Sequence, residues 1–170
     1  RRKSADFDFN AGRNSYTKDI NQVNICISHK GLSIFDEDKI YVNIASGVIG
    51  GSMSSRLFQE IREKKGLAYS VYTYNQNFSE GGVLSTYIGT NKESYEEAIE
   101  ITLKEFKKLR EEGITENELQ KAKNKYMSRI AFSMENPRSR MGILGNYYIR
   151  KNEILDSEKM KNEVNAVKLE

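Results

Sequence analysis

The sequence predicts an α+β fold, in which helices pack against one antiparallel sheet. Apolar and polar residues alternate over residues 67–88, and Gly81-Gly82 within this stretch marks the turn of a β-hairpin. From Asn91 onward, apolar residues recur every three or four positions, which is typical of amphipathic helices. Together with an earlier strand and two earlier helices, these patterns predict a small sheet covered by several helices.

The first strand is expected over residues 22–28. It follows a polar and irregular segment, residues 1–20, that is typical of a linker running into the edge of a sheet. Three apolar side chains would share one face of the strand: Val23, Ile25 and Ile27. Cys26 lies within the same apolar run and is expected to be a buried structural thiol.

Two helices are expected between this strand and the hairpin. Asp36 could cap the first, which would run to about Ser46 and be broken by the glycines that follow. Ser52 or Ser54 could cap the second, which would run to about Lys64. In the hairpin, simple alternation predicts two sets of side chains on opposite faces: Tyr69, Val71, Thr73 and Asn75 on one, and Ala68, Ser70, Tyr72 and Tyr74 on the other.

The second half of the sequence is predicted to be helical. Gly113 is expected to end the long helix in a left-handed conformation. Thr115 and Glu118 have the spacing of a capping box and predict the start of the next helix. Pro137 separates that helix from a further one, and the tail from Ser157 also has a helical pattern.

Composition narrows the classes of function. A chain of 170 residues predicts one domain, which we assign to residues 21–170. The net charge is only +3, and 27 basic residues are interleaved with 24 acidic ones, which argues against binding of nucleic acid. The single cysteine excludes an intrachain disulfide and a cysteine zinc cluster. No apolar run is long enough to span a bilayer and no signal-peptide pattern opens the chain, so we expect a cytoplasmic protein with no membrane partner.

The segment GGSMSSRLFQEIREKKGLAYSVYTY, residues 50–74, resembles the pitrilysin, or insulinase, family of zinc peptidases. It is most similar to the branch that contains bacterial and mitochondrial processing peptidases. The resemblance begins near Gln22 and continues through REEGITENELQKAKN to the region of Ser139. Its specific part is the run Ser54-Ser55-Arg56-Leu57-Phe58 followed by an arginine, a glycine and a tyrosine at family spacing: Arg62, Gly66 and Tyr69.

The resemblance implies half of a two-part enzyme with the processing-peptidase-like metallohydrolase fold. In that family, two homologous α+β halves face each other, and the N-terminal half carries an inverted H-x-x-E-H zinc motif. This sequence has a single histidine, His29, and therefore resembles the C-terminal half that lacks the motif. The chain is expected to bind no cofactor itself, with zinc held by the partner half, which is either in the same polypeptide or a separate subunit.

The resemblance also implies the site. The C-terminal half presents an arginine and a tyrosine to the partner's active site, and Arg62 and Tyr69 occupy these positions. Both side chains can donate hydrogen bonds to a peptide carbonyl oxygen on which negative charge develops. Gly66 would let the chain reverse between them, and three residues would support the preceding loop: Ser54, Ser55 and Arg56.

Other interpretations of these residues follow from the sequence alone. Arg62 could pair with a neighbouring acid, and Tyr69 could be a half-buried sheet tyrosine. Ser54 and Ser55 could suggest a nucleophile, but no histidine is spaced to activate them, and helix capping explains at least one. His29 is expected to be a turn residue.

The expected function is substrate binding and completion of a partner's active site, with no catalysis by this chain alone. The alternative is a structural or scaffolding member of the same superfamily, which would not need both Arg62 and Tyr69. A peptide substrate and the zinc-bearing half are the expected partners, and the isolated domain is expected to form weak homodimers. The family's C-terminal half extends beyond a point such as Val167, so a final strand or helix is expected to follow.

Overall fold

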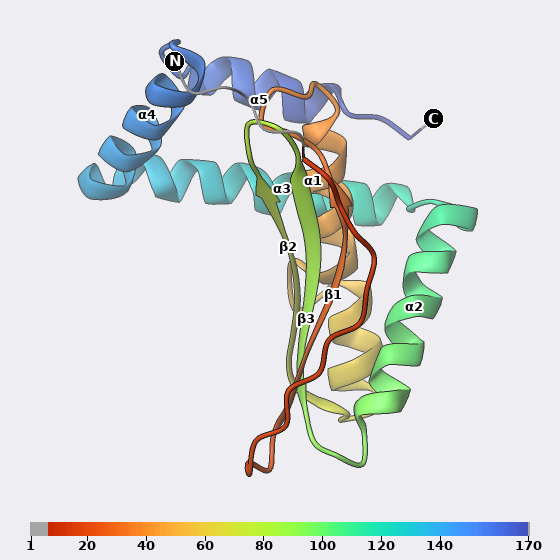
Figure 1. Cartoon of the computed structure of the whole chain (residues 1–170). Coiled ribbons are helices and arrows are strands. Elements are labelled where there is room, and N and C mark those ends of the chain that lie inside the picture. Colours follow the sequence, from red (N-terminus) through yellow and green to blue (C-terminus); the bar gives the residue numbers. More distant parts are fainter. Residues whose placement is uncertain (1–6, 170) are drawn as a thin grey trace. The chain divides into compact units, whose positions relative to one another are not determined.

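The structure is a computed structural model that describes residues 7–169 (Figure 1). Its described part contains nine regular elements: β1 (Val23–Gly31), α1 (Lys39–Gly50), the π-helical segment η1 (Phe58–Glu63), β2 (Ala68–Asn77), β3 (Gly82–Thr90), α2 (Tyr95–Glu112), α3 (Glu116–Glu135), α4 (Pro137–Lys151) and α5 (Ser157–Ala166). Residues 7–20 form no helix or strand, and the rest of the predicted linker, residues 1–6, lies outside the described residues. The predicted α+β fold is confirmed.

The chain divides into two compact units, which are described separately. The first runs to Gly113 and contains the sheet with α1, η1 and α2, and the second runs from Ile114 and contains α3, α4 and α5. The assignment of residues 21–170 to one domain stays a prediction.

The three strands of the first unit form one antiparallel sheet in the order β1-β3-β2. The central strand β3 places Ile88 opposite Ile25 of β1 and Val71 of β2. Both β1 and β2 are therefore edge strands within the described residues, as expected for β1. The observed β1 extends three residues beyond the predicted strand and includes His29, so the prediction of a turn histidine is wrong.

One face of this sheet carries the core of the first unit. Helices α1, η1 and α2 lie against this face (Figure 1), which we call the covered face. Apolar side chains from the strands and helices are almost completely inaccessible there: Ile49, Leu57, Ile61, Ala68, Val71, Ile88 and Ala98. Burial of each isoleucine, leucine or valine among them contributes about 1.5–3 kcal/mol, so this layer is the main source of stability for the unit.

A β-bulge at the start of β2 changes the predicted face of two residues. Ala68 pairs with Thr90 and Ser70 pairs with Gly89, so Tyr69 is an extra residue between them. Ala68 is 7% exposed on the covered face, whereas Tyr69 is 65% exposed. The prediction that Tyr69 shares a face with Val71 is wrong, because simple alternation assumes a strand without an inserted residue.

Cys26 is also placed differently from the prediction. Its neighbours Ile25 and Ile27 pack against the core, but Cys26 is exposed on the opposite face of β1. The apolar run in the sequence does not make every member buried, since successive side chains of a strand point to opposite faces.

Helix α1 begins and ends later than predicted. Asp36 does not cap it; its carboxylate accepts a hydrogen bond from the backbone N–H of Asp38, at the turn before the helix. The helix continues to Gly50, where the absence of a side chain allows α1 to approach the sheet closely. A Cβ atom at Gly50 would lie 2.6 Å from the backbone nitrogen of Thr73. The Ser46 hydroxyl also donates to the Thr73 carbonyl at 3.4 Å.

Helix α2 ends at Gly113 with a φ of 73° and a ψ of −151°. The positive φ agrees with the predicted helix end, but the ψ value lies outside the left-handed helical region that was predicted. Glycine reaches this conformation without the steric penalty that a side chain would add.

The second unit begins with the predicted capping box. The Thr115 hydroxyl accepts from the N–H of Glu118, whose carboxylate accepts from the N–H of Thr115. Pro137 is the first residue of α4. The ammonium of Lys123 on α3 is buried and donates to the carbonyl oxygens of Asn165 and Val167. These two hydrogen bonds join α3 to the end of α5.

Candidate functional site

The segment that carries Arg62 is a π-helix. The N–H of Lys64 bonds to the carbonyl of Gln59 at 2.9 Å, one residue further along the chain than in an α-helix. Segments of this kind are rare and occur often at functional sites. Within η1, Ile61 is fully buried, whereas Arg62 is exposed and its guanidinium lies 4.9 Å from the centre of the Phe58 ring. This cation–π contact limits the positions that the arginine can adopt.

The serines before η1 organise the loop and do not cap the helix. Ser52 and Ser54 share a hydrogen bond between their hydroxyls, at 3.1 Å. Ser55 is 2% exposed, and its hydroxyl donates to the carbonyl of Ser52 at 2.5 Å. No side-chain cap is present at η1, so the predicted cap by Ser52 or Ser54 is wrong. The predicted role of Ser54 and Ser55 in supporting the site stays a prediction.

After η1 the chain reverses at Gly66, which has a φ of 63°. The N–H of Gly66 donates to the carbonyl of Arg62 at 3.0 Å, and the N–H of Leu67 donates to the carbonyl of Ile61 at 2.8 Å. A residue with a side chain is strained at this φ, so glycine suits the reversal. The last turn of η1 and the first residues of β2 are therefore held together by backbone hydrogen bonds.

Tyr69 follows this reversal as the extra residue of the β-bulge. Bulges are frequent beside active sites, because they redirect a side chain out of the regular alternation. The two predicted site residues, Arg62 and Tyr69, thus flank one reversal and are both exposed. The sequence pattern did not predict the bulge. Tyr69 itself was predicted as a site residue from the family resemblance.

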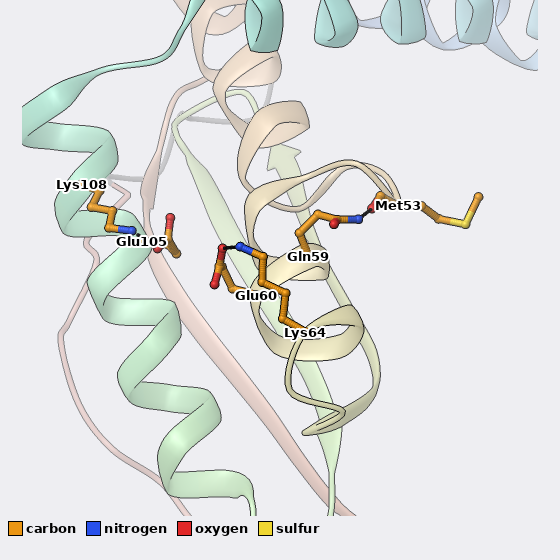
Figure 2. Close-up of polar contacts among 6 residues, drawn as sticks. All are labelled: Met53, Gln59, Glu60, Lys64, Glu105 and Lys108. Carbon is orange, nitrogen blue, oxygen red and sulfur yellow. Dashed lines mark hydrogen bonds and ion pairs between the residues drawn. The ribbon is translucent and has the colours of Figure 1, made fainter.

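Two polar contacts join the segment around η1 to α2. Near the C-terminal end of α2, the Arg56 guanidinium donates to the carbonyl of Gly113 at 2.9 Å. Near its N-terminal end, Lys65 pairs with Glu97 at 2.5 Å. Between them lie two ion pairs that face each other, each within its own segment (Figure 2). Lys64 pairs with Glu60 at 2.5 Å beside η1, and Lys108 pairs with Glu105 at 2.7 Å on α2.

Glu105 of α2 is a buried acidic residue beside the candidate site that the sequence-based prediction did not include. It is only 4% exposed, and its carboxylate accepts from Lys108. This hydrogen bond, and then the charge of Glu105, raise the pKa of Lys108. The interaction is present below the ordinary pKa of lysine and is lost as pH rises through the raised value. The signal in the sequence is an acid between Thr102 and Phe106, both on the apolar stripe of the helix.

The comparisons with known proteins identify the family. Residues 3–126 match the family described as the Peptidase M16 inactive domain.

The chain belongs to this family.

Along 168 residues, this M16 inactive domain is 35% identical to the protein named uncharacterized zinc protease YmxG of Bacillus subtilis, over 96% of the chain. It spans 40% of that relative's length.

Solved structures show the same fold. A protease from Helicobacter pylori matches 89% of this chain with a TM-score of 0.79, at 22% identity and over 37% of its own length. A chain of complex III2 from Candida albicans also matches 89% of this chain, with a TM-score of 0.77, at 17% identity and over 38% of its length. At these identities the two matches support the fold alone.

The residues of this M16 inactive domain do not fit a zinc site. No group of three or more His, Cys, Asp or Glu side chains that could hold a metal occurs within residues 7–169. His29 packs against Phe106 of α2, with ring centres 5.0 Å apart. Among the same residues, no helix combines the length and apolar character needed to cross a membrane.

Proposed function

We propose that this chain is the substrate-binding, non-zinc half of a pitrilysin-like zinc metallopeptidase. Arg62 and Tyr69 would complete the active site of a partner half that carries the H-x-x-E-H motif. The observation that carries the proposal is the exposure of both side chains on either side of one reversal, which backbone hydrogen bonds hold closed.

The chemistry of the two side chains suits a peptide substrate. The Arg62 guanidinium and the Tyr69 hydroxyl are both donors, and each can bond to the carbonyl oxygen that gains negative charge when a peptide bond is attacked. Such donors are effective only when they are positioned before the reaction, because reorganisation in the transition state costs free energy. The Phe58 contact and the β-bulge supply this positioning for Arg62 and Tyr69, respectively.

The relatives support a partner half. The Bacillus relative is named a zinc protease, and this chain accounts for 40% of it. Since the present residues do not fit a zinc site, the remainder of such a protein is the proposed location of the metal.

The test is a cleavage assay with the two halves together. The protein would combine this chain with the zinc-bearing half of the same organism, and a quenched fluorescent peptide would report hydrolysis. Arg62→Ala and Tyr69→Phe should each lower kcat/KM about 100-fold or more, which is the usual effect of removing one donor to a developing oxyanion.

Two matched variants control for general effects of the substitutions. Arg110→Ala removes an exposed arginine of α2, and Tyr41→Phe removes the hydroxyl of an exposed tyrosine of α1. Both should keep full activity. If the zinc-bearing half works equally well alone, or if Arg62→Ala and Tyr69→Phe match these controls, the proposed role is wrong.

A scaffolding role is the second candidate function. The same fold occurs in a chain of complex III2 from Candida albicans, so the fold by itself does not require a peptidase. Under this alternative, Arg62 and Tyr69 would contribute only to packing or solubility. Silent variants in the cleavage assay, together with co-purification of a stable larger complex that contains no peptidase activity, would support the scaffold.

A further inference from the structure

The face of the sheet opposite the helices is open and rich in tyrosine. We call it the tyrosine face and define it by the residues that the bulge, the strand register and alternation place there: Asn24, Cys26, Ser28 and Lys30 of β1; Tyr69, Ser70, Tyr72, Tyr74 and Gln76 of β2; and Val83, Ser85, Tyr87 and Gly89 of β3. Apart from its tyrosines, it consists largely of small or uncharged polar residues.

The tyrosines form a connected row across two strands. Tyr72 lies opposite Tyr87, with ring centres 5.0 Å apart in a stacked arrangement, and its ring centre is 5.8 Å from that of Tyr74. The Tyr87 hydroxyl donates to the side-chain oxygen of Asn24 at 2.6 Å. Tyr72 nevertheless remains 47% exposed. A large aromatic surface is therefore held in place by its neighbours while it stays accessible.

This face is almost free of charge. Lys30 is its only side chain that is charged at neutral pH, and it lies at the opposite end of the sheet from Tyr69. A carboxylate held against Tyr72 would lose hydration without gaining an ionic partner, which is unfavourable. An aromatic group could gain offset or edge-to-face contacts with the exposed ring. The face thus favours aromatic or large apolar side chains over acidic ones.

We propose that the tyrosine face binds an extended segment of the peptide substrate, with an aromatic or large apolar side chain against Tyr72. The inference rests on the proposed function, since it concerns the specificity of the same site. Tyr69 lies three residues before Tyr72 on the same strand, so a peptide that contacts Tyr69 can continue over this face. The edge strand β2 also offers backbone groups with which an extended peptide can pair.

The composition of the face favours a reversible ligand over a permanent partner surface. Permanent interfaces resemble a sectioned core and are mainly apolar. This face instead combines rigid tyrosines with serine, glycine and asparagine, the combination that antibody binding loops use for varied ligands. The hydroxyls of Ser28 and Ser85 bond to each other at 2.9 Å and keep the centre of the face polar. We therefore assign the face to substrate rather than to the zinc-bearing half or a second copy of this chain.

The experiment separates binding from hydrolysis. The two-half protein carrying Arg62→Ala would be titrated into a labelled peptide of alanine and glycine with one central phenylalanine, and fluorescence anisotropy would give the Kd. Matched peptides would carry leucine, alanine, aspartate or lysine at the same position. We expect the phenylalanine peptide to bind most tightly and the aspartate peptide most weakly.

Three further variants test the contact itself in the same background. Tyr72→Ala should weaken binding of the phenylalanine peptide about 3–10-fold, the range for an aromatic pair, and leave the alanine peptide unchanged. Tyr72→Phe should restore the preference, because the ring and not the hydroxyl is invoked. Tyr41→Ala, on an exposed tyrosine of α1, should have no effect.

Several results would overturn the inference. Equal affinities across the peptide panel, or a preference that survives Tyr72→Ala, would show that the face does not select the side chain. Loss of contact between the two halves or a change of oligomeric state in Tyr72→Ala, measured by sedimentation, would assign the face to the zinc-bearing half or to a second copy. If Arg62→Ala keeps full activity but the preference for the phenylalanine peptide still depends on Tyr72, only the proposed transition-state role of Arg62 is rejected.

Discussion

The two faces of the three-stranded sheet differ in what they contribute. On the covered face, Val71 and Ile88 are almost completely buried beneath helices, and the side chains form the core. On the tyrosine face, Tyr69 and Tyr72 remain accessible although they lie on β2, the strand that also carries the buried Val71. Burial of apolar area stabilises the fold, whereas accessible aromatic area is available to a ligand. One sheet therefore carries the core on one side and the proposed binding surface on the other, according to the direction of its side chains.

The separation of the two faces depends on one inserted residue at the start of β2, Tyr69. The bulge keeps Ala68 on the covered face and leaves Tyr69 accessible. Without the inserted residue, alternation from the buried Val71 would place Tyr69 on the covered face and Ala68 on the opposite face. Substitutions on the two faces should accordingly differ in their effect on stability, and the following measurements test that difference from the largest effect to the smallest.

Ala68→Asp should be the most damaging change. It would place an unpaired carboxylate in the core, where Ala68 is 7% exposed, and lower the free energy of unfolding by about 3–5 kcal/mol. Tyr69→Asp is the matched change on the adjacent residue and should cost less than about 0.5 kcal/mol. Urea denaturation measures both. A larger loss for Tyr69→Asp than for Ala68→Asp would contradict the bulge and restore the simple alternation.

Gly50→Ala tests how closely α1 approaches the covered face. The added methyl group would meet the backbone of Thr73, and the resulting overpacking should cost about 1–3 kcal/mol. Gly142→Ala is a useful control, because a Cβ at that helical position has no neighbour within 4 Å. It should stabilise α4 by roughly 0.5–1 kcal/mol. Thermal and urea unfolding that gave both variants the same sign would disprove the close approach.

Tyr72→Ala tests the tyrosine face as a contributor to stability. Loss of its ring contacts with Tyr74 and Tyr87 should lower the free energy of unfolding by about 0.5–1.5 kcal/mol. Tyr72→Phe keeps the ring and should be close to neutral. A loss above about 3 kcal/mol for Tyr72→Ala would instead mean that this face belongs to the core.

The ion pair between Lys65 and Glu97 should have the smallest effect. Its side chains are 47% and 48% exposed, so solvent screens the attraction. A double-mutant cycle with Lys65→Ala and Glu97→Ala should give a coupling free energy of about 0.2–1 kcal/mol, reduced further at high salt. A larger, salt-independent coupling would show that η1 is held to α2 mainly by charge rather than by the buried side chains of Leu57 and Ile61.

Much of the local structure was predictable because its causes are local. The capping box at Thr115 and Glu118, the end of α2 near Gly113 and the reversal at Gly66 each depend on a residue whose own chemistry suits the position. The position of Arg62 was also found from the sequence, through its spacing from Gly66 and Tyr69. The roles of Arg62 and Tyr69 stay a prediction.

What the sequence by itself determined is the α+β class, the family-specific pattern of residues and the absence of a second histidine that a zinc motif needs. Only the tertiary structure decided that Tyr69 is an inserted residue, that Cys26 is exposed and that Glu105 is buried on the side of α2 that faces η1. The physical reason is that periodicity records which residues could share a face. Strand register and the partners across each interface decide which face is covered, and those partners lie far away in the chain.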